Sequence, residues 1–292
     1  MIAVQLFVNG LIAGSIYALV ASGFSLIYAT NRFVHFAHGT TVTVGAYMLF
    51  TFFSLLGLNF FIAAFCTVVS TGLLGLLMFL LIYRPLKQRK SSNAILLVAS
   101  IGLMIFLENL MLLLFGADVK TLAYIPVRKG IELWGAIITP LQIVIIATAL
   151  LLLCFVWIFT KYTKLGKAMR AVADNEELAE IMGLNARAVQ AKSFVLGSGI
   201  AGLASVLVVL EQNIEPVMGT GLIIKGFTGA IIGGISSLPG AVLGSYLLGI
   251  VENFGIWWLP SGYKDAIAFV LLFLFLLVRP SGILGISKGI KE

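Results

Sequence analysis

Residues 94–115 read AILLVASIGLMIFLENLMLLLF, an apolar run in which Glu108 carries the only charge. A run of about 20 such residues is long enough to cross a hydrocarbon core about 30 Å thick, because a helix rises about 1.5 Å per residue. Leu, Ile, Val and Phe fill the run without the two-residue alternation that a membrane β-barrel needs. The stretch therefore predicts a transmembrane helix, whose backbone polar groups are satisfied within the segment.

The same pattern recurs along the chain. Hydrophobic residues make up 60% of the 292 residues, charged residues make up 11%, and the mean hydropathy of +1.10 lies far outside the range of water-soluble domains. We predict an all-α, polytopic membrane protein in which residues 1–292 form a single transmembrane domain with about 8–9 transmembrane helices. The predicted spans are 4–29, 40–56, 60–83, 94–115, 139–160, 193–210, 222–236, 239–258 and 266–278.

Some of these helices are expected to be short, broken or re-entrant. The pair covering 222–258 is rich in Gly and is divided by an SSLPG turn at Ser236–Gly240. Interrupted helices are tolerated at membrane depth where protein or a water-filled cavity surrounds them. The first span has no basic segment before it and exceeds signal-peptide length, so we expect it to remain as a helix.

Lys and Arg gather in three segments, at residues 84–90, 161–192 and 279–291. The positive-inside rule predicts that all three are cytoplasmic. With nine crossings, the N-terminus and the loop at 116–138 are then outside and the C-terminus is cytoplasmic. This topology accounts for the net charge of +7, with anionic membrane lipid as the partner of the basic segments and no need for nucleic acid.

Motifs for catalysis or cofactor binding are missing from the sequence. No G-x-x-x-x-G-K-[ST] occurs, so the chain is not expected to bind ATP itself, and neither G-x-S-x-G nor H-E-x-x-H is present. Cys66 and Cys154 lie in apolar spans with no His at zinc-ligand spacing. His35 and His38 lack a neighbouring carboxylate or thiolate and make a poor metal site. We therefore predict a non-catalytic membrane subunit with no cofactor and no metal.

The longest polar segment, residues 161–192, contains a short amphipathic helix. Asp174, followed three residues later by Glu177, resembles a capping box with Asp in place of the usual Ser or Thr. The apolar stripe and the helix end that follow are Leu178, Ile181, Met182 and Gly183. So short a helix is unstable alone. Its apolar face is expected to dock either on the protein's own membrane core or in a groove of a cytoplasmic partner.

A second polar segment, residues 31–45, reads NRFVHFAHGTTVTVG and holds both histidines between two apolar runs. Such a break forms a substrate site in some transporters, but on the predicted topology it is equally an ordinary turn near the cytoplasmic face. The candidate pathway residues are His35, His38, Thr40 and Thr41. Their imidazole and hydroxyl groups could bond freed backbone or a zwitterionic solute, or could simply be packed and hydrogen-bonded.

Two Glu-Asn pairs interrupt apolar runs, Glu108-Asn109 and Glu252-Asn253. A charged side chain at the bilayer centre costs roughly 2.5–3.5 kcal/mol on insertion scales, so each pair is expected to face the interior of the bundle. There it either lines a translocation pathway or forms a structural pair with a backbone amide, a Trp or a Thr.

Several short motifs follow one another along nearly the whole chain. They are VHFAHG (34–39) with GAY (45–47), YRPL (83–86), EELAEIMGLNARAVQAKSFVL (176–196), KGFTGA (225–230) with GGI (233–235), LPGA (238–241) and RPSGILG (279–285). In combination they resemble the permeases of branched-chain amino-acid ABC importers. One departure is His35, where that family has Asn before F-A-H-G.

The resemblance implies a subunit of an importer in a bacterial-type inner membrane. It would form the translocation pathway for branched-chain or related hydrophobic amino acids with a second homologous permease or a copy of itself. Cytoplasmic ATP-binding subunits would bind the ATP and drive alternating access, and an extracytoplasmic solute-binding protein would deliver the small zwitterionic solute. The residues that the resemblance assigns to ATPase coupling are Asp174, Glu177, Leu178, Ile181, Met182, Gly183 and Leu184.

Two alternative functions remain open. The same architecture could import urea or short-chain amides, because in such systems much of the specificity lies in the binding protein. A stand-alone channel or secondary transporter is a different class. An ATP requirement for uptake and co-purification of an ATP-binding subunit would argue against that second alternative.

Overall fold

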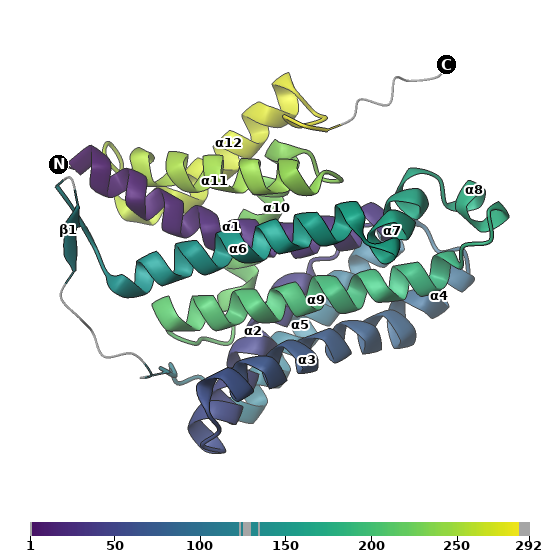
Figure 1. Ribbon diagram of the computed structural model, residues 1–292, viewed down its shortest axis with the longest axis horizontal. Helices are drawn as coiled ribbons and strands as arrows, with labels where there is room; N and C mark the ends of the chain where they lie inside the picture. The colour runs from purple at the N-terminus through teal and green to yellow at the C-terminus, as the bar shows by residue number, and fades with distance from the viewer. Residues whose placement is uncertain (1, 123, 125–129, 134, 286–292) are drawn as a thin grey trace.

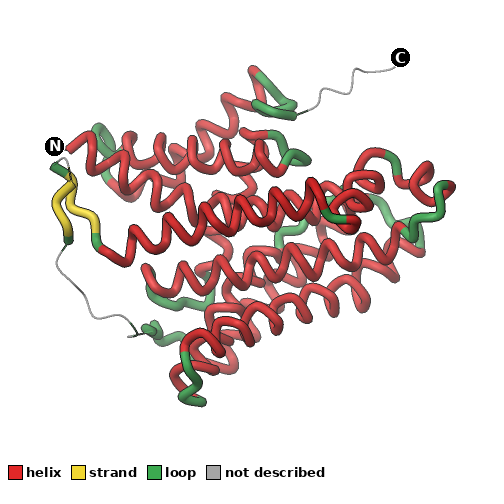
Figure 2. Tube along the Cα trace, viewed as in Figure 1, coloured by secondary structure: helices red, strands yellow, loops and turns green. Residues whose placement is uncertain are grey.

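The computed structural model describes residues 2–122, 124, 130–133 and 135–285, and most of them are helical (Figure 2). The helices of 18 residues or more are α1 (Ile2–Asn31), α3 (Phe60–Met78), α5 (Asn93–Phe115), α6 (Pro140–Tyr162), α9 (Ala186–Glu211) and α11 (Leu238–Gly255). The shorter ones are α2 (Ala37–Phe50), α4 (Arg84–Gln88), α7 (Lys164–Asp174), α8 (Glu176–Ile181), α10 (Met218–Gly233) and α12 (Lys264–Val278).

Other elements join these helices. A π-helical turn at Thr51–Leu55 extends α2, another at Phe79–Tyr83 joins α3 to α4, and a 3₁₀ turn at Ser261–Tyr263 leads into α12. An antiparallel hairpin of β1 (Ile131–Leu133) and β2 (Ala136–Ile138) precedes α6. Polar residues just before several helices accept a backbone N–H of the first turn and so fix where those helices begin. These N-caps are Asn59, Ser92, Thr139, Asn185 and Ser237.

Six helices in the described part of the chain are long and apolar enough to cross a membrane, or seven if the bent pair α10 and α11 counts as one span. The six are Ile2–Asn31, Phe60–Gln88, Asn93–Phe115, Pro140–Tyr162, Ala186–Glu211 and Ser261–Val278. The predicted count of 8–9 is not confirmed. The predicted spans at 40–56 and 222–236 appear as α2 and α10, whose α-helical parts of 14 and 16 residues are shorter than a hydrocarbon core requires.

The helices α10 and α11 differ in direction by 116° across a break of four residues, as expected for the SSLPG turn. Their close approach depends on glycine. A Cβ added at Gly233 would lie 1.7 Å from the carbonyl oxygen of Gly240, so no other residue fits there without separating the two helices. Interfaces of small residues are the usual means of close packing between membrane helices.

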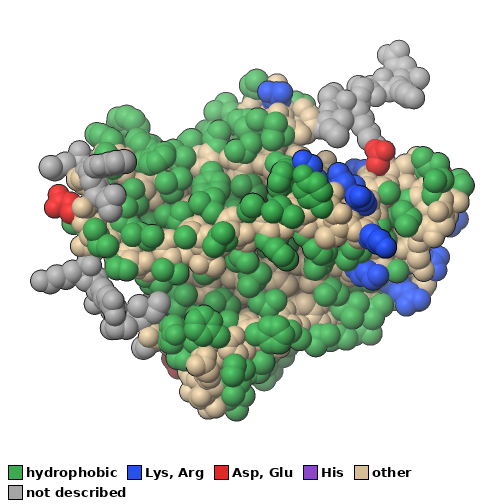
Figure 3. Space-filling view, viewed as in Figure 1, with side chains coloured by type: hydrophobic (Ala, Val, Ile, Leu, Met, Phe, Trp, Pro, Cys, Tyr) green, Lys and Arg blue, Asp and Glu red, His purple; other side chains and the backbone are tan. Residues whose placement is uncertain are grey.

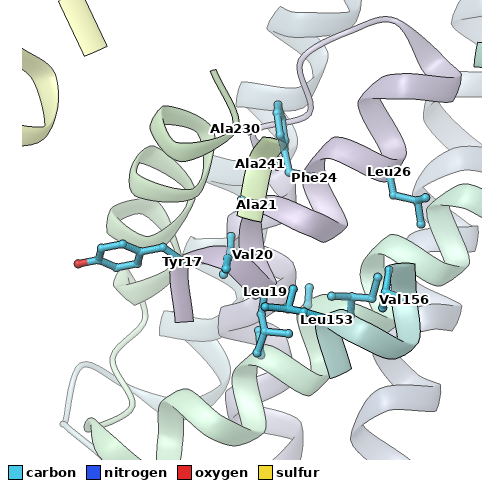
Figure 4. Close-up of a cluster of buried hydrophobic side chains, with 14 of the residues drawn as sticks. Tyr17, Leu19, Val20, Ala21, Phe24, Leu26, Leu153, Val156, Ala230 and Ala241 are labelled. Carbon is cyan, nitrogen blue, oxygen red and sulfur yellow. The ribbon is translucent and has the colours of Figure 1, made fainter. Parts of the chain in front are cut away.

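Helix α1 runs through the centre of the bundle, and 89% of the residues in its most apolar 18-residue stretch are buried. It packs mainly against α11, α9 and α10, with α6 on another side (Figure 1). Figure 4 shows Leu19, Val20, Ala21 and Phe24 of α1 in a cluster with Leu153 and Val156 of α6. Few residues of the candidate spans α5, α6 and α12 are buried, and these helices provide much of the apolar outside of the bundle.

Basic side chains gather at one end of the bundle. Figure 3 shows Lys and Arg over the end that carries α7 and the start of α9, and in Figure 1 the N-terminus and β1 lie at the opposite end. Gln5 of α1 bonds the backbone of Ile137 in both directions, which fixes the hairpin to that opposite end. The basic segments 84–90 and 161–192 therefore share one end of the bundle. Lys288 and Lys291 lie outside the described residues.

Candidate functional site

The predicted amphipathic helix is α8, and its N-cap differs from the prediction. Asp174 is the last residue of α7, and the cap of α8 is Asn175, whose side chain accepts the backbone N–H of Leu178 at 3.0 Å. The predicted capping box of Asp174 and Glu177 therefore places the N-cap one residue too early. Asp and Asn are almost equally good caps, so an Asp-Asn pair does not reveal which of the two begins the helix.

The end of α8 agrees with the prediction. Gly183 has φ +85°, and the N–H groups of Gly183 and Leu184 bond the carbonyl oxygens of Glu180 and Ala179 at 2.9 and 3.0 Å. This pair of bonds is a Schellman motif, in which a Gly with positive φ closes the helix. The motif turns the chain back into α9.

The apolar stripe of α8 does not dock on the membrane core of this chain. Leu178 is 55% exposed, Ile181 80% and Met182 77%. Ala179, in contrast, is buried in the main hydrophobic cluster of the bundle, and Glu176 accepts a hydrogen bond of 2.9 Å from Gln190 of α9. Helix α8 is thus anchored on one side and presents three large apolar side chains on the other.

The first part of the segment 161–192 packs against the bundle. Helix α7 buries Met169 and Val172 against the bundle, and a cavity of about 620 Å³ separates α7 from the turn between α10 and α11. Arg32, which follows α1 and has φ +60°, donates from its guanidinium to the carbonyl oxygen of Ala173. The loop is therefore linked directly to the break between α1 and α2.

In that break, residues 32–36, Phe33 and His35 are buried and Arg32 is exposed, and His38 follows in the first turn of α2. The Tyr83 hydroxyl lies 2.9 Å from His35 Nδ1, and both His35 and His38 are fully buried. Sequence reasoning missed Tyr83, which belongs to the YRPL motif. Thr40 and Thr41 both donate to the carbonyl oxygen of Ala37. In the described residues His35 Nε2 and both ring nitrogens of His38 have no hydrogen-bond partner.

The two Glu-Asn pairs have different surroundings. Glu252 is fully buried, as expected, and its Oε2 accepts from Tyr17 at 3.0 Å and from Lys225 at 3.3 Å. Lys225 also pairs with Asp265 at 3.1 Å, and Asn253 accepts from Lys264. The result is an ionic network that joins α1, α10, α11 and α12. Lys225 was missed as a site residue, although a lone charge inside an apolar run is a sufficient signal.

In the other pair, Glu108 is half-buried and its Oε1 accepts from the Thr220 hydroxyl of α10. Asn109 is exposed and bonds only the backbone of Ile105, so the prediction that it faces the interior is wrong. The physical reason is that adjacent residues of a helix point about 100° apart, and α5 buries only the narrow stripe of Leu96, Ser100, Leu107 and Met111, so Asn109 falls outside it. In α11, which is more enclosed, Glu252 and Asn253 are both buried.

A cavity of about 320 Å³ lies between α5, α10 and α12. The surface that it exposes is apolar, although Thr220 and Thr228 are among the residues around it. The lining residues are Phe36, Ile101, Met104, Thr220, Ile223, Ile224, Phe227, Thr228, Phe269 and Leu272. The described residues contain no group of three metal-ligating side chains, and Cys66 and Cys154 are free thiols.

A buried central helix, a bent helix pair and an exposed apolar helix at a basic end define a polytopic helical transport subunit of a membrane. Residues 6–276 match the family described as branched-chain amino acid transport system / permease component, and the chain belongs to that family. It is thus the permease component of an ABC importer.

Curated relatives cover almost the whole chain. The high-affinity branched-chain amino acid transport system permease protein BraD of Pseudomonas aeruginosa is 36% identical over 96% of this chain and 95% of its own length. The corresponding protein LivH of Escherichia coli is 35% identical over 95% of this chain and 94% of its own. A probable LivH of Methanocaldococcus jannaschii is 28% identical over 97% and 93%. No solved structure matches the chain.

Proposed function

We propose that this permease imports branched-chain or related hydrophobic amino acids across a bacterial-type inner membrane. The named substrates of the relatives at 35–36% identity support this choice over urea or short-chain amides. The energy comes from ATP bound by separate cytoplasmic subunits. An extracytoplasmic binding protein delivers the solute, and a second homologous permease or a copy of this chain completes the pathway.

The observation that carries the coupling role is the exposed stripe of α8. Three large apolar side chains stand on a helix that is anchored by Asn175, Glu176 and the Schellman motif, so they are presented in a fixed geometry. A preformed apolar helix face of this kind fits a groove of another protein. The contact to the ATP-binding subunit is made by Leu178, Ile181 and Met182, and Asp174, Glu177, Gly183 and Leu184 shape the loop.

We propose that the end carrying the basic segments is cytoplasmic and that the N-terminus lies outside. The Lys and Arg gathered over α7 and the start of α9 favour this orientation by the positive-inside rule. We also propose that α2 with its π-turn, α10 and α11 add crossings to the six long helices, which brings the total to nine. Both proposals are testable with single cysteines labelled from either side of sealed vesicles.

An affinity purification tests the function. The tagged permease, extracted gently from its native membrane, is expected to bring ATP-binding subunits and a second permease or second copy, and reconstituted vesicles should take up leucine only with ATP and the binding protein. Urea competing with leucine for the binding protein would favour the urea alternative. Uptake that persists without ATP would indicate a channel or secondary transporter.

A further inference from the structure

The cavity of about 620 Å³ at the basic end of the bundle has a charged side and an apolar side. Arg32 after α1, Lys161 of α6 and Arg170 of α7 line it. Asp174 is the one carboxylate among the described residues of the lining, so a net positive charge faces the cavity. The large apolar residues of the lining are Leu26, Trp157, Met169, Leu238, Pro239 and Leu284. A ligand that fits both sides has an anionic head and an apolar body.

Backbone hydrogen bonds hold two of these cations in place. Nη2 of Arg170 donates to the carbonyl oxygen of Lys161 at 2.9 Å, and the guanidinium of Arg32 donates to the carbonyl oxygen of Ala173. Each guanidinium has five N–H donors, so both keep further donors for a ligand. None of the ion pairs found in the described residues includes the three cations of the cavity. Their charge and their remaining donors suit an anion with several oxygens, such as a phosphate group.

Aromatic residues place this cavity at the level of lipid headgroups. Nζ of Lys161 lies 4.6 Å from the ring centroid of Trp157 and 5.4 Å from that of Tyr162. These residues belong to the last two turns of α6, whose 23 residues are enough to cross a hydrocarbon core. Trp and Tyr concentrate where a transmembrane helix meets the membrane–water interface, and Lys extends its charge into the same layer. The cavity therefore lies beside the phosphates of one leaflet.

An exposed apolar stripe leads from the cavity toward the middle of the bilayer. Leu150, Cys154, Trp157 and Lys161 recur at helical spacing and so share one face of α6. All four are exposed, Leu150 by 50% and Trp157 by 39%. A lipid whose phosphate lies at Lys161 can lay an acyl chain along this stripe and remove apolar surface from other contacts. A soluble phosphate gains nothing from the stripe, so the arrangement favours a lipid.

We propose that this cavity binds the phosphate headgroup of one anionic phospholipid, held by Arg32, Lys161 and Arg170, with an acyl chain along the exposed face of α6. The lipid contacts α6, α7 and the turn between α10 and α11 together. It therefore braces the first part of the segment 161–192, which carries α8, against the bundle. The assignment does not depend on which solute the permease imports.

The test counts the lipids that stay bound to the full-length permease, with the subunits that co-purify, in native mass spectrometry. The sample is equilibrated with equal amounts of phosphatidylglycerol and phosphatidylcholine. We expect the wild type to retain phosphatidylglycerol several-fold over phosphatidylcholine and the double variant Lys161→Gln/Arg170→Gln to lose that preference. Lys164→Gln/Lys167→Gln is the matched control, because it removes two exposed cations of α7 that do not line the cavity, and it should keep the preference.

A second variant tests the shape of the cavity with every charge in place. Ala29 lines the cavity, and Ala29→Phe narrows it, so retention of phosphatidylglycerol should fall several-fold. Ala147→Phe adds the same side chain at an exposed position of α6 and should leave retention unchanged. In nanodiscs of phosphatidylcholine, added phosphatidylglycerol should slow proteolysis within 161–192 for the wild type but not for Lys161→Gln/Arg170→Gln. If Ala29→Phe does not fold, the charge variants decide the assignment.

Three results would overturn this lipid site. The first is equal retention of both lipids by the wild type. The second is an equal loss of preference in both double variants, since attraction to the whole basic end would then be sufficient. The third is displacement of the lipid by inorganic phosphate at the same concentration, which would indicate a site for a soluble anion. A failure of leucine uptake would bear on the proposed function alone.

Discussion

The side chains of Lys225 on α10 and Glu252 on α11 form an ion pair of 3.3 Å inside the bundle, with Glu252 fully buried and Lys225 only 14% exposed. The pair closes a network in which Tyr17 of α1 and Asp265 at the start of α12 take part. The consecutive helices α10, α11 and α12 are thereby held at one point together with α1, which is distant from them in sequence.

Removing one member of this pair is expected to destabilise the protein strongly. Lys225→Met leaves the Glu252 carboxylate buried without a cation, which costs about 3–5 kcal/mol in comparable buried pairs. The double variant Lys225→Met/Glu252→Gln should recover a large part of the loss, because no unpaired charge remains. Unfolding in SDS, analysed as a double-mutant cycle, measures the coupling. Strictly additive effects of the two substitutions would contradict it.

The coupling role of α8 predicts variants that fold but do not assemble. Leu178→Asp and Ile181→Asp add a charge to side chains that are already exposed, so the yield of inserted permease should not change. Co-purification of the ATP-binding subunits and ATP-dependent uptake should both fall at least tenfold.

The contrasting variant for this experiment is Val172→Asp on α7. Val172 is only 3% exposed, and an unpaired carboxylate there should reduce the yield of folded protein. Normal co-purification of ATP-binding subunits with both α8 variants would contradict the coupling role.

Gly183 is expected to be sensitive to substitution because of its backbone conformation and not because of its neighbours. Its φ of +85° is unfavourable for side chains with a Cβ, by about 1–2 kcal/mol, although no atom would obstruct a Cβ there. Gly183→Val should fray the end of α8 and lower uptake several-fold without changing the stability of the bundle. Gly183→Asn should be close to wild type, because Asn tolerates this conformation. Limited proteolysis at 181–185 reports the fraying, and equal cleavage of both variants would argue against it.

The bent helix pair depends on contact between two backbones. Gly233→Ala places a Cβ 1.7 Å from the Gly240 oxygen, which forces α10 and α11 apart. Overpacking typically costs 1–3 kcal/mol, and a backbone obstacle has little freedom to adjust, so we expect at least about 3 kcal/mol. Gly221→Ala, also in α10 but with open space around it, should be tolerated. The fraction of monodisperse protein after gentle extraction measures both, and equal fractions would refute this contact.

Much of this architecture can be predicted from apolar runs and basic segments. The long spans, the SSLPG break and the basic segments at one end of the bundle depend on composition over many residues, and such signals survive small errors of register. The count of spans could not be predicted, because α2 and α10 are short and their role depends on packing around them. Length alone does not separate a short crossing from a re-entrant segment.

The site was predicted unevenly for similar reasons. The interior position of Glu252 could be predicted from its charge, and the apolar stripe on α8 could be predicted from its periodicity. The cap at Asn175 was missed because Asp174 has almost the same capping chemistry, and the outward position of Asn109 because helix phase is not visible in an unbroken apolar run. The cation of Glu252 is Lys225, 27 residues earlier in the chain, and only tertiary structure pairs them.

The burial of α1 has a consequence for how the protein is made. This helix is synthesised before the other described helices, yet α9, α10 and α11, against which it packs, follow more than 150 residues later. Until these helices are inserted, α1 must lie against lipid. Two of its hydroxyl groups need no other helix in this interval, because Ser15 and Ser22 donate to Leu11 and Leu19 of the same helix at 2.8 Å. The central helix of the finished subunit must therefore be stable in lipid on its own, until the helices made in the last third of translation pack around it.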